Sequence, residues 1–339
     1  MLKKLENKSV LILGLGREGM SSLKYFLRHY PQNQLAVADQ LAFERLSVET
    51  QSLLKKYSQV KTFLGKNYLT VLDNYDVIIR TPGISPFLTA LTRAKKQGKF
   101  VISQTQLFFE LFPGKIIGIT GTKGKSTTTK LIYEILRQAK RDVFLVGNIG
   151  LPALDVLDKA KPESLAVYEL SSHQLADLSR GPDIAVILNI VPEHLDYYQD
   201  KDEYMEAKGQ ITFHQGPDDY LIFNPQYPNP KKLAARSKAQ KRYISLEQEV
   251  GPGAFVKDGF IEVNDSNSAE IIMPTAEVPL KGAFNLENVC AAIMATRVLG
   301  VDIPIQVQAI KAFKSLPHRL EFGGEYKGIS FYNDSLATV

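Results

Sequence analysis

The chain has 339 residues, of which 44% are hydrophobic and 23% charged. This composition is typical of folded globular proteins, excludes disordered and fibrous chains, and at roughly 150 residues per domain the length predicts about two domains. The formal net charge of +5 is too small for a nucleic-acid surface and suits a small anionic ligand.

Two further features bear on the compartment. A single cysteine, Cys290, excludes an internal disulfide framework and a cysteine-rich zinc site, and fits a reducing environment. The N-terminus runs straight into a predicted strand, and no apolar run reaches the roughly 20 residues of a membrane span. We therefore expect a cytoplasmic protein with no membrane or nucleic-acid partner. Separately, we expect the protein to be a monomer.

Short apolar runs alternate with helical stretches in the N-terminal third, which predicts a parallel sheet with crossover helices. The predicted strands are Ser9–Leu13, Leu35–Ala38, Val77–Ile79 and Phe100–Ser103. A helix over Thr105–Leu111 followed by the stop signal Pro113-Gly114 indicates a domain boundary near residue 110.

A second series of strands predicts a separate α/β unit, because its branched apolar residues suit strands buried on both faces. These strands are Ile116–Thr120, Val143–Val146, Leu165–Glu169, Ile184–Leu188 and Tyr220–Phe223. Further along, the sequence predicts a hairpin around Asp258-Gly259, helices at Leu286–Leu299 and Ile305–Phe313, and two strands within Glu321–Tyr332. The predicted fold class is α/β, with a Rossmann-like domain followed by a P-loop domain.

A glycine-rich turn, Gly14-Leu15-Gly16-Arg17-Glu18-Gly19, directly follows the first strand and opens a helix. In this context G-x-G-x-x-G directs helix amides at an anion, and Asp39 closes the second strand where a dehydrogenase acid would hold a ribose hydroxyl. The turn predicts a nucleotide or diphosphate ligand, with NAD as the first candidate. Alternatively, the glycines only let strand and helix pack closely. A second turn, Arg80-Thr81-Pro82-Gly83-Ile84, is either a ligand loop or an ordinary turn.

The strongest motif is Gly121-Thr122-Lys123-Gly124-Lys125-Ser126-Thr127, between an apolar strand and a long helical pattern. Its amides can wrap phosphate oxygens, Lys125 can neutralise charge, and a hydroxyl of Ser126 or Thr127 can bind Mg²⁺. It departs from the common G-x-x-x-x-G-K-[ST] form because Ile119 stands five residues before Gly124. The motif predicts triphosphate binding and weakens the NAD interpretation.

Polar residues follow two more strands of this unit. Glu169 ends one strand, which is where a hard-cation ligand is expected near a P-loop. Asn189, His194 and Asp196 follow the next strand and point to the same sheet edge. Lys208 lies on the helix after them, and a lone lysine on a charged helix is usually solvated.

These motifs occur in the order found in the Mur ligases, which the chain resembles over most of its length. The matching residues are Gly121–Thr127, Glu169 to Gln174, Asn189 to Asp196, Tyr204 to Lys208, Gly282 to Asn288, His318-Arg319-x-Glu321 and Asn333-Asp334-Ser335. The turns Gly14–Gly19, Arg80–Pro86 and Gly147–Gly150 are most similar to the member that adds D-glutamate.

The resemblance implies an ATP-dependent amide ligation in peptidoglycan synthesis. ATP would phosphorylate the carboxylate of UDP-N-acetylmuramoyl-L-alanine, and the amine of D-glutamate would then displace the phosphate. UDP thereby replaces NAD as the ligand of the first domain, and Lys125, His194 and Lys208 become the catalytic residues. One Mg²⁺ would bind Glu169 and the hydroxyls of Ser126 and Thr127, and a second would bind His194 and a carbamylated Lys208.

The remaining residue roles also come from the resemblance. ATP would contact Gly121, Thr122, Lys123, Gly124, Lys125, Ser126 and Thr127, with Asn285 at the adenine, Arg319 at the phosphates and Asp334 at the ribose. The UDP-substrate would contact Gly14, Leu15, Gly16, Arg17, Asp39, Arg80, Thr81, Pro82, Gly83, Asn148, Ser171 and His194.

The chain departs from the family pattern at three positions: Glu193 in place of Asp, Phe284 in place of His, and Leu336 in place of a lysine linked to the phosphates. The expected domains are 1–110 for the UDP-substrate, 111–315 for ATP, and 316–339 as a linker and the start of a truncated C-terminal domain. We expect this chain to bind substrate but to be inactive alone. The alternatives are a Mur-type ligase for another amino acid, an NAD-dependent oxidoreductase and a regulatory nucleotide-binding module.

Overall fold

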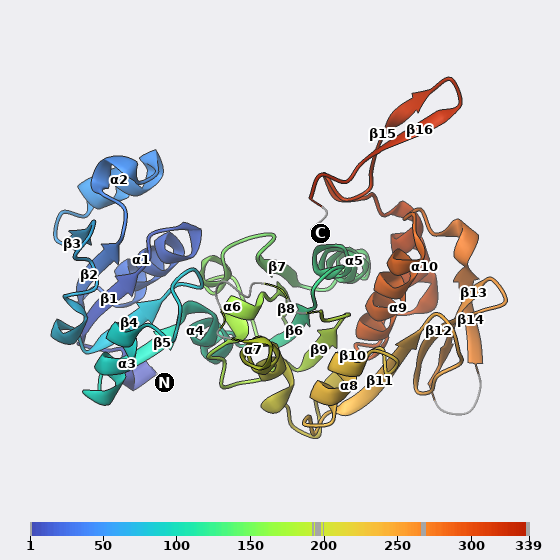
Figure 1. The fold of residues 1–339 in the computed structure, drawn as a ribbon, viewed down its shortest axis with the longest axis horizontal. Helices are drawn as coiled ribbons and strands as arrows, with labels where there is room; N and C mark the ends of the chain where they lie inside the picture. The colour runs from blue at the N-terminus through green and yellow to red at the C-terminus, as the bar shows by residue number, and fades with distance from the viewer. Residues whose placement is uncertain (1, 192, 194–197, 199, 266–268, 337–339) are drawn as a thin grey trace. The chain divides into compact units, whose positions relative to one another are not determined.

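The computed structural model describes residues 2–191, 193, 198, 200–265 and 269–336 (Figure 1). The chain divides into two compact units. Unit 1 contains Met1–Phe112, Leu151–Ala160 and Ser172–Arg180, and unit 2 contains Pro113–Gly150, Lys161–Ser171 and Gly181–Val339. Two short segments from the middle of the sequence therefore complete the N-terminal unit.

Unit 1 is built on a parallel sheet whose five described strands have the order β3-β2-β1-β4-β5. The strands are β1 (Ser9–Leu13), β2 (Gln34–Asp39), β3 (Lys61–Leu64), β4 (Val77–Arg80) and β5 (Phe100–Ser103). The helices are α1 (Arg17–His29), α2 (Val48–Lys56), α3 (Thr89–Lys96) and α4 (Gln104–Leu111), joined by α6 (Ser172–Leu175) from the middle of the chain.

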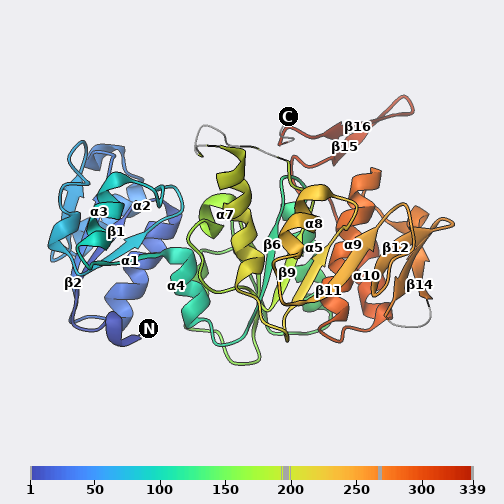
Figure 2. The same cartoon turned by 60° about the horizontal axis from the view of Figure 1, so that its bottom comes forward.

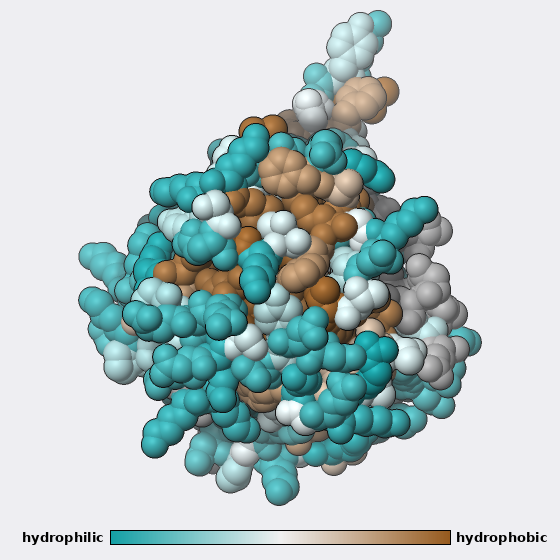
Figure 3. Space-filling model, turned by 90° about the vertical axis from the view of Figure 1, so that its left-hand side faces the viewer, coloured by the Kyte–Doolittle hydropathy of each residue, from teal (hydrophilic) through white to brown (hydrophobic). Residues whose placement is uncertain are grey.

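The central strands of unit 1 are apolar because both of their faces are covered. Leu11 and Ile78, on neighbouring strands, are fully buried, as are Leu23 and Phe26 on α1. Hydrophilic side chains dominate the face of this unit seen in Figure 3 and surround an apolar area. Strand β3 was not predicted, because its half-exposed Lys-Thr-Phe-Leu sequence at the sheet edge lacks the signal of a buried strand.

Unit 2 contains a larger sheet, with nine strands among the described residues in the order β14-β13-β12-β11-β10-β9-β6-β8-β7. Strands β6 to β12 pair in parallel, and β13 pairs antiparallel with both β12 and β14. The strands are β6 (Lys115–Thr120), β7 (Val143–Gly147), β8 (Leu165–Glu169), β9 (Ile184–Ile187), β10 (Tyr220–Phe223), β11 (Gln240–Ser245), β12 (Gly253–Lys257), β13 (Phe260–Asn264) and β14 (Ala269–Pro274).

Helices cover both faces of this sheet (Figure 2). Helices α5 (Lys125–Gln138), α9 (Ala283–Arg297) and α10 (Ile303–Ala312) pack together on one face, while α7 (Lys201–Phe213) and α8 (Pro228–Ala234) lie on the other. This doubly wound arrangement brings the carboxyl ends of the parallel strands to one edge, where ligands of such sheets bind.

The α/β fold class and the strands predicted from Ser9–Leu13 to Tyr220–Phe223 are confirmed, with small shifts at the strand ends. The hairpin around Asp258-Gly259 is formed by β12 and β13. Strands β15 (Glu321–Tyr326) and β16 (Ile329–Asn333) also form the predicted hairpin, and among the described strands they pair only with each other. Their apolar side chains, such as Phe322 and Ile329, are exposed.

Candidate active site

The phosphate loop lies between β6 and α5 in unit 2. Gly124 precedes the first turn of α5 with φ +82°, and a Cβ atom there would lie 2.3 Å from Asn288 Oδ1. At Gly121 a Cβ would lie 2.8 Å from Leu188 Cβ. Both positions therefore require glycine, and the loop leaves the amides at the start of α5 available to an anion.

Thr122 fastens this loop to the segment that follows β9. Its backbone N–H donates to Asn189 O at 2.8 Å, its hydroxyl donates to Val191 O at 2.8 Å, and the Val191 N–H donates back to the hydroxyl oxygen at 2.9 Å. The two predicted ligand segments are thus joined at the sheet edge. His194 and Asp196 lie outside the described residues.

Lys125 folds back over the loop. Its ammonium donates to Gly121 O at 2.9 Å and to Thr122 O at 2.8 Å. Burial lowers its pKa, the carboxylates of Glu169 and Glu193 oppose the shift, and the charge of Arg319 adds to it. Lys125 and Arg319 therefore act as two cations on the same site, which suits a polyanionic ligand.

Glu169 ends β8, beside the strand that leads into the phosphate loop. Only 4% of the residue is exposed, and its Oε2 atom has no hydrogen-bond partner among the described residues. A buried carboxylate oxygen without a donor is costly unless a ligand satisfies it. With the half-buried Ser126 and Thr127 at the start of α5, it offers the oxygen donors that Mg²⁺ prefers.

Lys208 is buried on α7, unlike the usual solvated lysine on a charged helix. Its ammonium donates to Gly121 O at 3.0 Å and to Thr120 Oγ1 at 3.4 Å. Its pKa is lowered to about 7, mainly by burial and also by the Lys125 charge, while Glu193 opposes the shift. The fold thus places the Lys208 ammonium at the phosphate loop. Its lowered pKa means that a large share of the side chain is a neutral amine near neutral pH.

Asn285 and Asn288 on α9 connect this helix to the first turn of α5, directly after the phosphate loop. Asn288 Oδ1 accepts from Thr128 Oγ1 at 3.1 Å, and its Nδ2 donates to Asn285 Oδ1 at 2.9 Å. Asn285 Nδ2 donates in turn to Lys281 O at 2.7 Å. Sequence reasoning assigned Asn285 a ligand role and gave none to Asn288, whose buried amide supports the loop.

Glu287, also on α9, was missed by the sequence analysis. Its carboxylate accepts from Asn224 Nδ2 at 3.1 Å and from the Tyr227 hydroxyl at 2.9 Å. It thereby fixes α9 to the turn after β10. The sequence carries no local signal for it, since its partners lie some sixty positions away in the chain.

Arg319 and Asp334 come from the C-terminal segment of unit 2. Arg319 Nη1 donates to Leu336 O at 2.6 Å, and Asp334 Oδ1 accepts from Leu320 N at 3.0 Å. Arg319 also influences Lys125 electrostatically. Asp334 is exposed on this segment.

The glycine-rich turn of unit 1 is shaped mainly by packing. A Cβ at Gly14, which has φ +96°, would lie 2.2 Å from Thr81 Oγ1, and one at Gly19 would lie 1.8 Å from Gly14 O. A Cβ at Gly16 would meet no atom of the described residues within 4 Å. Gly14 and Gly19 therefore permit the strand and helix to pack, while open space lies over Gly16.

Asp39 and Arg80 make internal contacts in unit 1. The Asp39 carboxylate accepts from Leu15 N at 2.6 Å and from Leu41 N at 2.8 Å. Arg80 is fully buried and pairs with Asp177 at 2.7 Å. Both side chains thus hold the ends of strands β2 and β4 in place. Thr81 is buried, Pro82 half-buried and Gly83 exposed in the turn that follows β4.

The exposed Asn148 and the half-buried Ser171 lie in unit 2, just past the ends of β7 and β8. The Asn148 N–H donates to Glu169 O at 3.3 Å. The structure therefore gathers Lys125, Glu169, Lys208 and Arg319 at the phosphate loop, with Asn148 and Ser171 on neighbouring strand ends.

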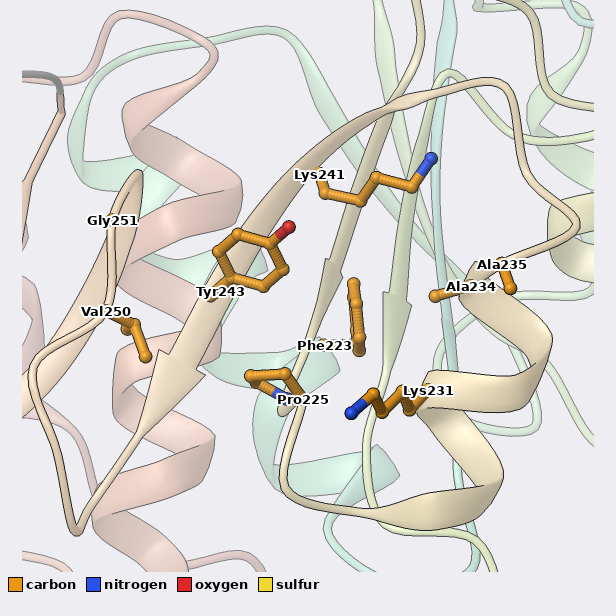
Figure 4. A pocket seen from close by; sticks show the side chains of 9 residues that line it. All are labelled: Phe223, Pro225, Lys231, Ala234, Ala235, Lys241, Tyr243, Val250 and Gly251. Atoms are coloured by element: carbon orange, nitrogen blue, oxygen red, sulfur yellow. The ribbon is translucent and has the colours of Figure 1, made fainter.

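A cavity of about 470 Å³ lies elsewhere in unit 2, beside α8 and over β10 and β11 (Figure 4). Phe223 and Tyr243 form apolar walls, and Lys231 and Lys241 stand at its rim. None of the predicted site residues is among the described residues that line it.

Two family models match the chain. Residues 8–103 match the Mur ligase MurD-like N-terminal domain, and residues 119–296 match the Mur ligase middle domain. The chain belongs to the Mur ligase family. The resemblance read from the sequence is thereby confirmed, and the P-loop region just described falls within the middle domain of a Mur ligase.

Two proteins similar to this Mur ligase chain carry the same name. The UDP-N-acetylmuramoylalanine--D-glutamate ligase of Acidobacterium capsulatum is 37% identical over 337 residues, which cover 98% of this chain and 72% of that protein. The ligase of the same name from Acetivibrio thermocellus is 33% identical, with 99% of this chain and 71% of that protein covered.

Solved structures share the fold. The UDP-N-acetylmuramate:L-alanyl-gamma-D-glutamyl-meso-diaminopimelate ligase from Neisseria meningitides gives a TM-score of 0.61 at 17% identity, covering 91% of this chain and 99% of that one. The UDP-N-acetylmuramate-alanine ligase from Thermotoga maritima gives 0.54 at 18% identity, covering 96% and 74%. Across the described residues, every helix is too short or too polar to cross a membrane.

Proposed function

We propose that this Mur ligase joins D-glutamate to UDP-N-acetylmuramoyl-L-alanine, with ATP as the energy source and an acyl phosphate as the intermediate. The observation that carries the proposal is the 37% identity to a ligase of that name over 98% of the chain. The gathering of Lys125, Glu169 and Lys208 at the phosphate loop supports it. We place the reaction in cytoplasmic peptidoglycan precursor synthesis and the enzyme in solution as a monomer.

The chemical task is to bring two polyanions together and transfer a phosphoryl group between them. Positioning and electrostatics supply most of the catalysis in such transfers. The amides of Gly121 to Thr127 would hold the ATP phosphates, and Lys125 would leave the loop carbonyls to neutralise them. Arg319 would add a second cation, Asn285 would contact the adenine and Asp334 the ribose.

We propose that two magnesium ions bind at this site. The unpartnered Glu169 Oε2 atom, with the hydroxyls of Ser126 and Thr127, would hold one ion. When bound, the ions would screen the phosphate charges and so favour the approach of two anions. Lys208 and His194, the latter outside the described residues, would hold the second.

Lys208 would take up this role as a carbamate. Its neutral amine attacks CO2, forming a nitrogen–carbon bond and releasing one proton, so that a cation becomes an oxygen donor. A pKa of about 7 makes the neutral amine abundant near neutral pH. Mass spectrometry of the native protein in bicarbonate and in CO2-free buffer tests this step, because the added mass of one CO2 should appear only in the former.

The UDP-substrate would bind to the turns of unit 1, and the family resemblance assigns Asn148, Ser171 and His194 of unit 2 to the same ligand. The open space over Gly16 would admit the ligand, and the amides of Leu15 and Arg17 would face its phosphates. Gly14, Asp39 and Arg80 would shape the turns, while Thr81, Pro82, Gly83, Asn148, Ser171 and His194 would line the ligand.

Binding and turnover test the proposal separately. Calorimetry should show saturable binding of the UDP-substrate and of Mg²⁺-ATP, with no binding of NADH. Because the relatives extend beyond the matched stretch, we expect residues 1–339 alone to form no amide steadily. A chimera with the unmatched part of the Acidobacterium capsulatum ligase should ligate D-glutamate in preference to L-glutamate or L-alanine. Tight NADH binding without UDP binding would instead support an oxidoreductase.

A further inference from the structure

A buried ion pair in unit 1 connects two segments that lie far apart in the sequence. Arg80 ends β4 and is fully buried, and Asp177 lies in the returning segment Ser172–Arg180. The Asp177 carboxylate accepts from Arg80 Nη2 at 2.7 Å and from Nε at 3.2 Å. This two-point contact neutralises a guanidinium that has no access to water.

The third nitrogen of Arg80 holds the turn that follows β4. Arg80 Nη1 donates to Ile84 O at 2.5 Å and to Thr81 O at 3.2 Å, so one side chain is hydrogen-bonded to both ends of the turn. Thr81 in turn donates to Leu13 O through its N–H at 3.1 Å and its hydroxyl at 3.0 Å. The hydroxyl also occupies the space where a Cβ of Gly14 would lie.

We propose that Asp177 is a positioning residue for the UDP-substrate, acting through Arg80 on the 81–84 turn and through Thr81 on the glycine-rich turn. The inference rests on the proposed function, in which these two turns bind the UDP moiety. A buried cation is tolerated only with its counter-ion, so without the carboxylate the guanidinium leaves its site and releases the turn. Asp177 lies eight residues after Glu169, the candidate magnesium ligand at the end of β8. The same stretch of chain therefore contains a candidate metal ligand and the residue that holds the UDP turns.

The test compares two ligands on the purified chain. UDP and Mg²⁺-ATP are titrated by calorimetry into the wild type, Asp177→Asn, Asp177→Glu and Asp158→Asn. Asp158 is the matched control because it joins the other returning segment to Arg28 and His29 on α1, away from the 81–84 turn. We expect Asp177→Asn to raise the Kd for UDP about tenfold while the Kd for ATP stays constant. Asp177→Glu should recover part of the affinity, and Asp158→Asn should bind both ligands normally.

Loss of folding is separated from loss of positioning by the double variant Arg80→Met/Asp177→Leu. An apolar pair removes the need for a counter-ion and keeps the interior filled, so this variant should fold but still bind UDP weakly. Normal UDP binding by folded Asp177→Asn or by the double variant would overturn the positioning role alone. Failure of the wild type to bind UDP would overturn both this inference and the proposed function.

Discussion

Both units place a glycine-rich turn between a buried strand and a helix, yet the two turns differ in what surrounds them. In unit 1 the polar groups beside the turn, Asp39 and Arg80, are taken up by contacts within the fold. In unit 2 a lysine, an unpartnered carboxylate oxygen and a second buried lysine converge on the loop. One turn therefore presents mainly its backbone to a ligand, and the other supplies charged side chains for chemistry.

The largest expected effect is at Lys125. Replacing it with alanine removes the charge that would stabilise the transferring phosphoryl group, and ligation by the chimera should fall on the order of 10³-fold. Lys130→Ala removes the same charge one turn further along α5, where Lys130 pairs with Glu134, and should leave the rate unchanged. An equal loss of ligation rate in both variants would mean that Lys125 has no specific catalytic role.

A pH effect follows from Lys208. Its pKa falls from 10.5 in the unfolded chain to about 7 in the fold, so between these pH values the unfolded state binds more protons and the free energy of unfolding rises with pH. Lys208→Met should flatten this rise, by about 3 kcal/mol between pH 7 and 10 in CO2-free buffer. Urea denaturation of both proteins across this pH range measures the effect. If the free energy of unfolding rises equally with pH in the wild type and in Lys208→Met, the pKa of Lys208 is not lowered.

The glycines provide a direct comparison between the turns. Gly124→Ala places a Cβ against Asn288 at a positive φ and should lower the free energy of unfolding by about 2 kcal/mol, with weaker ATP binding. Gly16→Ala meets open space and should leave stability unchanged. Thermal unfolding of both variants decides this, and the prediction is wrong if Gly16→Ala is the more harmful.

The smallest effect is expected at Asp39. Asp39→Asn replaces a carboxylate that accepts two backbone N–H groups and should cost about 1 kcal/mol of unfolding free energy. UDP should bind more weakly to this variant and ATP normally, as calorimetry will show. A selective loss of ATP binding would contradict the separate roles of the two units.

Much of this protein was predictable because its signals are local. A buried strand such as Ile116–Thr120 needs an apolar run, and the loop after it needs glycines, a lysine and hydroxyls in a fixed order. These features gave the fold class, the phosphate loop and the family resemblance. The weakly patterned edge strand β3 carried no such signal.

The tertiary structure decided what each polar side chain contacts. The local sequence around Lys208 is typical of a solvated lysine on a charged helix. Only the packing of α7 against the phosphate loop buries the side chain and lowers its pKa. Arg80 reads as a ligand contact, and only the return of the chain to unit 1 brings it the carboxylate of Asp177. Burial and charge pairing depend on residues distant in sequence, so a local pattern specifies an element but not the partners of its side chains.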